Sequence, residues 1–112
     1  MKMVIAMIPH SKLEDVKNEL NKVEVTRMTV NDVRGFGRQK GHTEIIRGRE
    51  IQINFVSKLE IKIAVNDEFL EPTIEAIKKG SYTGKAGDGK IFVMPLEQVH
   101  RISTKEEGTK AI

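Results

Sequence analysis

An alternating segment in the middle of the chain restricts the fold more than any other feature. From position 58 to 65 the sequence reads KLEIKIAV, so branched aliphatic residues alternate with charged or small ones. Successive side chains of a β-strand point to opposite faces of its sheet. We therefore expect a strand here with one face packed against a core and the other face carrying charge.

The N-terminal third of the chain predicts a strand followed by a helix. Met1 to Ile8 is rich in β-branched and apolar residues and stops at Pro9, which indicates a buried strand. Ser11 and Glu14 have the spacing of a capping box, so a helix is expected to begin at Ser11. Its core-facing stripe would consist of Leu13, Val16 and Leu20.

The next segments are less regular. Val23 to Val33 carries β-branched residues in near alternation, which predicts a second strand. From Gly35 to about Asn54 the chain is polar, charged and interrupted by glycines and by two isoleucine pairs. This region is compatible with a long protruding loop or with two ragged strands.

A second helix is expected after the alternating strand. Asn66 or Asp67 can cap it, Gly80 is a plausible stop, and Pro72 predicts a distorted start because proline lacks an N–H group and crowds the preceding turn. The apolar face of this helix would consist of Phe69, Leu70, Ile74 and Ile77.

The order of elements predicts the fold class. Ile91 to Val93 is expected to form a further strand, Gln98 to Ile102 a shorter one, and the segment TKEEGTK a solvated tail. The resulting order is βαββαβ, the split pattern of ferredoxin-like α+β folds, in one domain over residues 1–112. Because this fold carries many functions, function has to be inferred from sites.

Composition excludes several classes of protein. The chain has 112 residues, a formal net charge of +3 and no cysteine, so disulfides and thiolate metal sites are excluded. Charges of both signs make up 31% of the residues, which indicates a solvated surface more than a nucleic-acid partner. The run MVIAMI is too short for a membrane span, so we expect no membrane insertion and a cytoplasmic location.

A glycine-rich loop is the first candidate for chemistry. The segment GKAGDGK, Gly84 to Lys90, matches the start of a Walker A loop, but Ile91 follows where that motif needs Ser or Thr and then a helix. A glycine-rich anion site remains, with converging backbone amides and the positive charges of Lys85 and Lys90. The alternative is an ordinary flexible turn with solvated lysines.

RNA binding and catalysis find little support. The stretch RGFGRQKGH begins like an RNA-binding signature, but Arg38 and Gly41 occupy the positions where that signature needs aromatic rings. Aromatic residues make up 4% of the chain, which argues against stacking on bases. His10, His42 and His100 lack metal-ligand spacing, and neither a Ser-His-Asp set nor a carboxylate pair is evident.

Three stretches together resemble the PII family of nitrogen-regulatory signal proteins. They are VRGFGRQKGHTEI, RGRE and TGKAGDGKIFV, and the likeness runs in register along nearly the whole chain. The resemblance implies a homotrimer with clefts between subunits that take ATP or ADP, and 2-oxoglutarate binding beside Mg-ATP. It also implies that RGFGRQKGH ends the second strand and begins the T-loop, a segment that reads effectors and contacts partners.

Site residues follow from the same resemblance. Gln39 would complete the Mg²⁺ shell and contact 2-oxoglutarate, Lys58 would pair with a carboxylate of 2-oxoglutarate, and Arg47 matches a partner-binding arginine of the T-loop. The residues implied in nucleotide binding are Thr29, Gly35, Gly37, Arg38, Ala64, Gly87, Asp88, Gly89, Lys90 and Arg101.

The chain also departs from the family's pattern. Ile51 and Arg49 stand where some members carry a modifiable tyrosine and serine, so neither modification is expected. Ser103 replaces a second phosphate-binding arginine, which removes a bidentate donor. The common Lys then Glu order on the charged strand is reversed to Glu60 then Lys62. The entry to the first helix also differs from the family's pattern.

The resemblance predicts a regulator and not primarily an enzyme. It would bind ATP or ADP and 2-oxoglutarate and would regulate an ammonium transporter or enzymes of nitrogen metabolism. The alternative from the enzyme class is weak nucleotide hydrolysis in the same cleft, which the absence of an evident general base disfavours.

Overall fold

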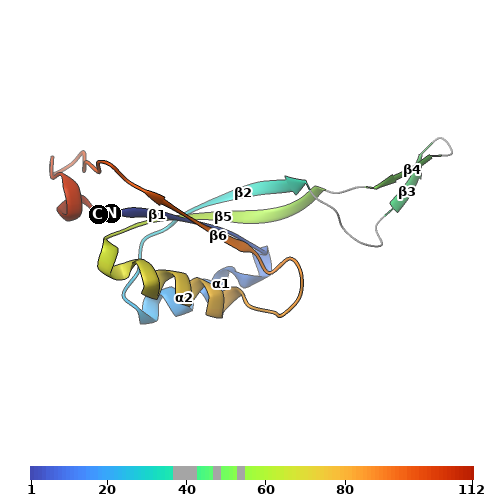
Figure 1. Ribbon diagram of the computed structural model, residues 1–112, viewed down its shortest axis with the longest axis horizontal. Coiled ribbons are helices and arrows are strands. Elements are labelled where there is room, and N and C mark those ends of the chain that lie inside the picture. Colours follow the sequence, from blue (N-terminus) through green and yellow to red (C-terminus); the bar gives the residue numbers. More distant parts are fainter. Residues whose placement is uncertain (37–42, 47–48, 53–54) are drawn as a thin grey trace.

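The computed structural model of the chain describes residues 1–36, 43–46, 49–52 and 55–112 (Figure 1). Short 3-10 turns span His10–Lys12, Asp67–Phe69 and Gly108–Ala111. The strands and helices are β1 Lys2–Ile8, α1 Leu13–Lys22, β2 Thr29–Phe36, β3 Thr43–Ile46, β4 Arg49–Gln52, β5 Phe55–Val65, α2 Leu70–Ser81 and β6 Lys90–Pro95.

Four of the strands form one antiparallel sheet in the order β2-β5-β1-β6. The two helices lie side by side and cover one face of this sheet (Figure 1). The chain order βαββαβ of these elements and the antiparallel pairing confirm the ferredoxin-like α+β fold predicted from the sequence.

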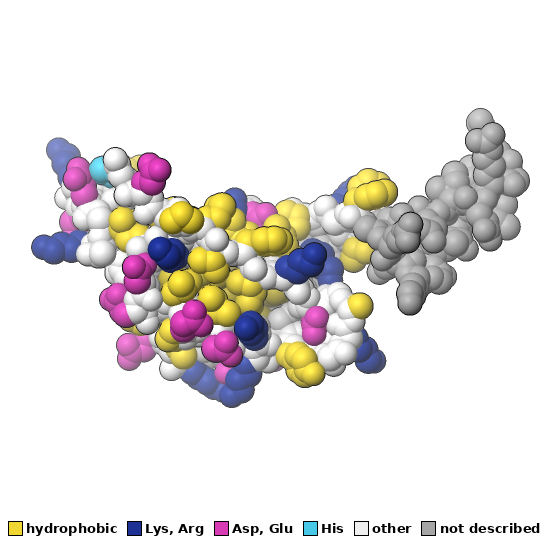
Figure 2. Space-filling model, in the orientation of Figure 1, with side chains coloured by type: hydrophobic (Ala, Val, Ile, Leu, Met, Phe, Trp, Pro, Cys, Tyr) yellow, Lys and Arg dark blue, Asp and Glu magenta, His cyan; other side chains and the backbone are white. Residues whose placement is uncertain are grey.

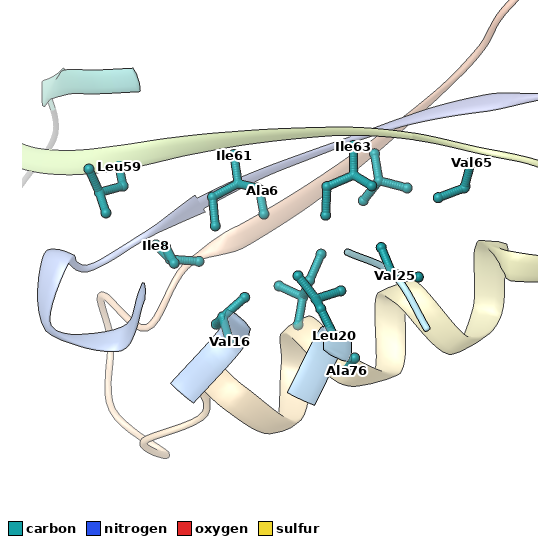
Figure 3. Close-up of a cluster of buried hydrophobic side chains, with 12 residues drawn as sticks. Ala6, Ile8, Val16, Leu20, Val25, Leu59, Ile61, Ile63, Val65 and Ala76 are labelled. Carbon is teal, nitrogen blue, oxygen red and sulfur yellow. The ribbon is translucent and has the colours of Figure 1, made fainter. Parts of the chain in front are cut away.

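The core lies between the sheet and the two helices (Figure 3). The alternation predicted along β5 is confirmed, since the four branched aliphatic side chains between Leu59 and Val65 are at most 6% exposed. Val16 and Leu20 of α1 are fully buried against them, as the helical stripe predicted. Removing this apolar surface from water is the main driving force for assembling sheet and helices. The core consists of Val4, Ala6, Ile8, Val16, Leu20, Val25, Leu59, Ile61, Ile63, Val65, Ala76 and Ile77.

Both helices begin differently from a capped helix. No side-chain hydrogen bond caps α1, so the predicted capping box of Ser11 and Glu14 is wrong. A 3-10 turn precedes α1 instead, and within it the Lys12 amide donates to the Pro9 carbonyl. A similar turn, Asp67–Phe69, precedes α2, and Pro72 lies in the first turn of that helix, which confirms the predicted distorted start.

Gly80 lies inside α2 and does not end it, because the helix continues to Ser81. A Cβ atom at this position would lie 2.6 Å from the Cα of Val16 on α1. Glycine therefore permits the close approach of the two helices, and its role here is packing rather than termination.

The predicted second strand was placed too early in the sequence. Residues 23–28 form no strand, and β2 runs from Thr29 to Phe36. Glu24 has a positive φ of 64°, and the Val25 amide donates to the Leu20 carbonyl at the end of α1. Val25 is buried in the core, so the apolar residues of this segment pack without joining the sheet.

The strand predicted from Gln98 to Ile102 is also wrong. No strand spans residues 98–102, and the only pairing there is an isolated bridge between His100 and Glu107. The following residues form a 3-10 turn in which Ala111 is 7% exposed. The segment TKEEGTK is mostly exposed, as predicted, although Asn66 donates a hydrogen bond to the Thr109 carbonyl within it.

Within the region from Gly35 to Asn54, two-strand pairing is the alternative that the structure supports. β3 and β4 pair as an antiparallel ladder apart from the main sheet (Figure 1). Four predicted site residues lie outside the described residues, and nothing in the structure bears on them. They are Gly37, Arg38, Gln39 and Arg47.

Candidate functional site

The five predicted site residues that lie on strands share one face of the sheet. The strand registers place each of them opposite to the buried residues, on the face that the helices leave open. They are Thr29, Gly35, Lys58, Ala64 and Lys90. The sequence alone could not show this common face, because it depends on the pairing register.

The glycine-rich loop joins α2 to β6 at one end of this face. The backbone φ angles of Gly84, Gly87 and Gly89 are 77°, 101° and 124°. Residues other than glycine adopt such angles only with strain. A Cβ atom on Gly89 would lie 2.2 Å from the Met7 carbonyl oxygen, so the loop needs glycine there for close approach as well. Lys90 begins β6, and the loop is therefore not a Walker A loop.

Hydrogen bonds within this loop connect its first residues to Asp88 near its end. The Asp88 carboxylate accepts a hydrogen bond from the Thr83 amide at 3.1 Å and a longer contact from the Thr83 hydroxyl at 3.4 Å. The Ser81 hydroxyl donates to the carbonyl of Asp88, and the Lys85 amide donates to the Thr83 hydroxyl. Hydrogen bonds from backbone amides, that of Thr83 first, hold the pKa of Asp88 below its usual range. Asp88 is therefore charged at neutral pH.

The sequence reasoning did not identify Ser81 or Thr83 as part of this site. The signal that could have found them is the hydroxyl residues just before a glycine loop that contains Asp, since such side chains bond nearby backbone groups in turns. Asp88 was predicted to hold phosphates. Its carboxylate is directed at Thr83, at the start of the loop, and no contact among the described residues tests the predicted role.

Lys58 connects β5 to the glycine-rich loop. Its ammonium group donates a hydrogen bond to the Gly87 carbonyl, 29 residues away in the sequence. Glu60, two residues along the same strand, pairs with Lys62 at 3.1 Å. Glu60 therefore pairs with Lys62 and not with Lys58, and the ammonium group of Lys58 contacts the loop.

A cavity of about 870 Å³ lies at the other end of the same sheet. It brings together Thr29, Ala64 and Arg101, three residues predicted to bind nucleotide, and Ser103 also lines it. Thr29 and Gly35 are six residues apart on β2, about 20 Å along an extended strand. The structure therefore places those predicted nucleotide residues that it describes in two groups, one at each end of the sheet.

The following findings on metal and membrane features apply to residues 1–36, 43–46, 49–52 and 55–112. In that part, no three His, Asp or Glu side chains are grouped closely enough to hold a metal ion. The ring of His10 bonds the hydroxyl of Ser57 at 3.0 Å, and the ring of His100 bonds the amide oxygen of Gln98 at 2.9 Å. No helix in the same part of the chain is long and apolar enough to cross a membrane.

The fold and the loop define a ferredoxin-like α+β protein with a glycine-rich loop before its last sheet strand. Comparison with known sequences agrees with this class. The family profile described as nitrogen regulatory protein P-II matches residues 1–106. The chain belongs to the nitrogen regulatory protein P-II family, which makes it a nitrogen-regulatory signalling protein.

Curated relatives match the chain over its full length. The nitrogen regulatory protein GlnK1 of Methanosarcina mazei is 58% identical over 114 aligned residues, covering 100% of this chain and 97% of the relative. The nitrogen regulatory protein P-II of Pasteurella multocida is 52% identical, with both chains covered completely. GlnK of Escherichia coli K12 is 46% identical with the same coverage.

Proposed function

We propose that this protein binds ATP or ADP, and 2-oxoglutarate beside Mg-ATP, and that it regulates a partner protein without being primarily an enzyme. The observation that carries this proposal is the glycine-rich loop at one end of the open sheet face, with Lys58 and Lys90 beside it. Backbone amides in a glycine loop and two ammonium groups suit the phosphates of a nucleotide.

The roles of the two lysines differ in this proposal. Lys90 follows the loop directly and contributes positive charge to the phosphates, together with the backbone from Gly87 to Gly89. Lys58 pairs with a carboxylate of 2-oxoglutarate, and its three N–H donors allow it to keep the bond to the Gly87 carbonyl at the same time. Gln39 would supply its amide oxygen, a hard ligand, to Mg²⁺, and the ion would neutralise negative charge at the site.

We also propose a homotrimer in which one subunit supplies the loop and its neighbour the cavity. The two groups of predicted nucleotide residues are about 20 Å apart along β2, which is too far for the base and phosphates of one nucleotide. An exposed apolar surface on the open sheet face supports this assembly. Its members are Met3, Ile5, Met7, Phe92 and Met94, of which Phe92 and Met94 are 49% and 47% exposed.

Hydrophobic side chains also gather over the middle of the molecule in the view of Figure 2, with Lys, Arg, Asp and Glu side chains around them. Such gathered apolar surface is typical of proteins that associate with partners. The proposed partners are an ammonium transporter or enzymes of nitrogen metabolism. Arg47 and the T-loop would contact them in the cytoplasm, where ATP and 2-oxoglutarate report on the state of the cell.

The experiment is titration calorimetry with ATP, with ADP, and with 2-oxoglutarate in the presence and absence of saturating Mg-ATP. The proposal expects ATP and ADP to compete for one class of site and 2-oxoglutarate to bind only with Mg-ATP. Sedimentation at micromolar concentration should give a trimer, and a stable monomer would contradict the assembly. Release of inorganic phosphate from ATP at a rate above background would favour the hydrolase alternative instead.

A further inference from the structure

Asp88 lies in the loop proposed to hold phosphates, although its negative charge would repel them. An aspartate with its carboxylate directed at a bound phosphate would weaken binding. In the structure the carboxylate is directed at Thr83, at the start of the loop, and accepts hydrogen bonds from it. The charge of Asp88 is thus satisfied inside the loop.

The contacts around Asp88 tie the two ends of the loop together. Thr83 lies just before the first glycine and Asp88 just before the last, so their hydrogen bond closes a ring of six residues. The Ser81 hydroxyl adds a second connection, from the last residue of α2 to the carbonyl of Asp88. Both ends of the loop are therefore attached, to α2 on one side and to β6 on the other.

This closure matters because the glycines would otherwise leave the loop free to adopt many conformations. Glycine loses more conformational freedom on ordering than any other residue. A phosphate that had to order three glycines on binding would be bound more weakly than by a loop already in place. The Thr83 amide donates to Asp88 and is not available to an anion. The part of the loop proposed to bind an anion is therefore the backbone from Gly87 to Lys90.

We infer that Asp88 is a positioning residue, whose carboxylate holds the glycine-rich loop in the shape that receives phosphates through its backbone and Lys90. This inference rests on the proposed nucleotide binding and deepens it. It assigns to Asp88 a contact with Thr83 in place of a contact with the nucleotide or its metal ion.

The test compares Asp88→Ala with Asp88→Asn. Alanine removes the acceptor for the Thr83 amide, and we expect a loss of affinity for ATP and ADP of about tenfold. Asparagine keeps a neutral oxygen in the same place, so it should retain affinity within about threefold of the parent. The loss in Asp88→Ala should be equal for ATP in EDTA and for Mg-ATP.

Other outcomes would overturn the inference. Tighter nucleotide binding by Asp88→Ala would mean that the carboxylate faces and repels phosphate. A loss confined to Mg-ATP, and equal in Asp88→Asn and Asp88→Ala, would mean that Asp88 is a metal ligand. Asp15→Ala, an exposed change on α1, is the matched control and should bind nucleotide as the parent does.

A second measurement needs no nucleotide. Hydrogen exchange of the Thr83 amide, followed by NMR, should be faster in Asp88→Ala than in the parent and nearly unchanged in Asp88→Asn. Thr83→Ala, which removes only the hydroxyl contacts, should give a smaller loss of nucleotide affinity than Asp88→Ala. Unchanged exchange in Asp88→Ala would overturn the role of Asp88. A parent protein that binds no nucleotide would overturn the proposed function instead.

Discussion

The ammonium group of Lys58 donates a hydrogen bond to the carbonyl of Gly87. This contact joins a central strand of the sheet to the loop that precedes β6. A lysine proposed to bind 2-oxoglutarate is therefore already paired with the proposed phosphate loop. Because an ammonium group has three N–H donors, Lys58 can donate to the carboxylate of an anionic ligand while it keeps its bond to the loop.

The first prediction concerns 2-oxoglutarate. Lys58→Ala should abolish its binding, since the cation that faces the carboxylate is lost, while ATP alone should still bind. Titration calorimetry with saturating Mg-ATP measures both. Glu60→Gln is the comparison on the same strand. Because Glu60 pairs with Lys62, this change should strengthen 2-oxoglutarate binding only modestly, by about 1 kcal/mol or less.

The second prediction concerns the phosphates. Lys90→Ala should weaken ATP and ADP alike, because a charge-assisted bond to phosphate contributes about 1.5 to 3 kcal/mol, or roughly tenfold or more in the dissociation constant. Calorimetry with each nucleotide provides the measurement. Lys78→Ala removes an exposed lysine from α2, on the opposite side of the sheet, and should leave both affinities unchanged. Equal affinities of Lys90→Ala and the parent would show that Lys90 does not contact phosphate.

The fold was predictable wherever a short-range pattern determined it. The alternation from Lys58 to Val65 determines which face of β5 is buried. It could be predicted because the two-residue period of a strand depends on local backbone geometry and not on distant residues. Val23 and Val25 show the limit. They look like strand residues, yet they pack on the core directly after α1, because burial satisfies an apolar side chain without any sheet pairing.

The site divides in the same way. Glycine spacing located the loop, since positive φ angles are a local requirement. The direction of the Asp88 carboxylate and the contact of Lys58 with Gly87 depend on segments that meet only in the folded chain. Spacing in the sequence does not encode these contacts.

The third prediction concerns the contact between the two helices. Gly80→Ala should destabilise the protein by about 2 kcal/mol, because overpacking against the Val16 backbone outweighs the better helix propensity of alanine. Urea unfolding at a fixed protein concentration measures the free energy of unfolding. Gly35→Ala is the matched control. Its Cβ would meet nothing closer than the Val56 carbonyl oxygen at 3.8 Å, so its stability should equal or exceed that of the parent.

The last prediction concerns the pH dependence of stability. Glu19 of α1 pairs with Lys22 at 2.9 Å and with Lys79 of α2 at 3.6 Å. The hydrogen bond from Lys22, more than any other contact, holds the pKa of Glu19 below its ordinary value of 4.5, while burial acts in the opposite direction. A carboxyl group whose pKa is lowered by folding stabilises the folded state above 4.5 and loses that contribution as the pH falls through the folded pKa.

Glu19→Gln should therefore be less stable than the parent at pH 7, and the difference should shrink as the pH falls below 4.5. Urea unfolding at a series of pH values provides the measurement. Glu14→Gln is the control, since Glu14 pairs with Lys17 of its own helix, at 3.3 Å. It should change stability by no more than about 0.5 kcal/mol, because an exposed pair within one helix contributes little. A constant difference between Glu19→Gln and the parent from pH 7 to pH 3 would show that Glu19 acts through packing and not through its charge.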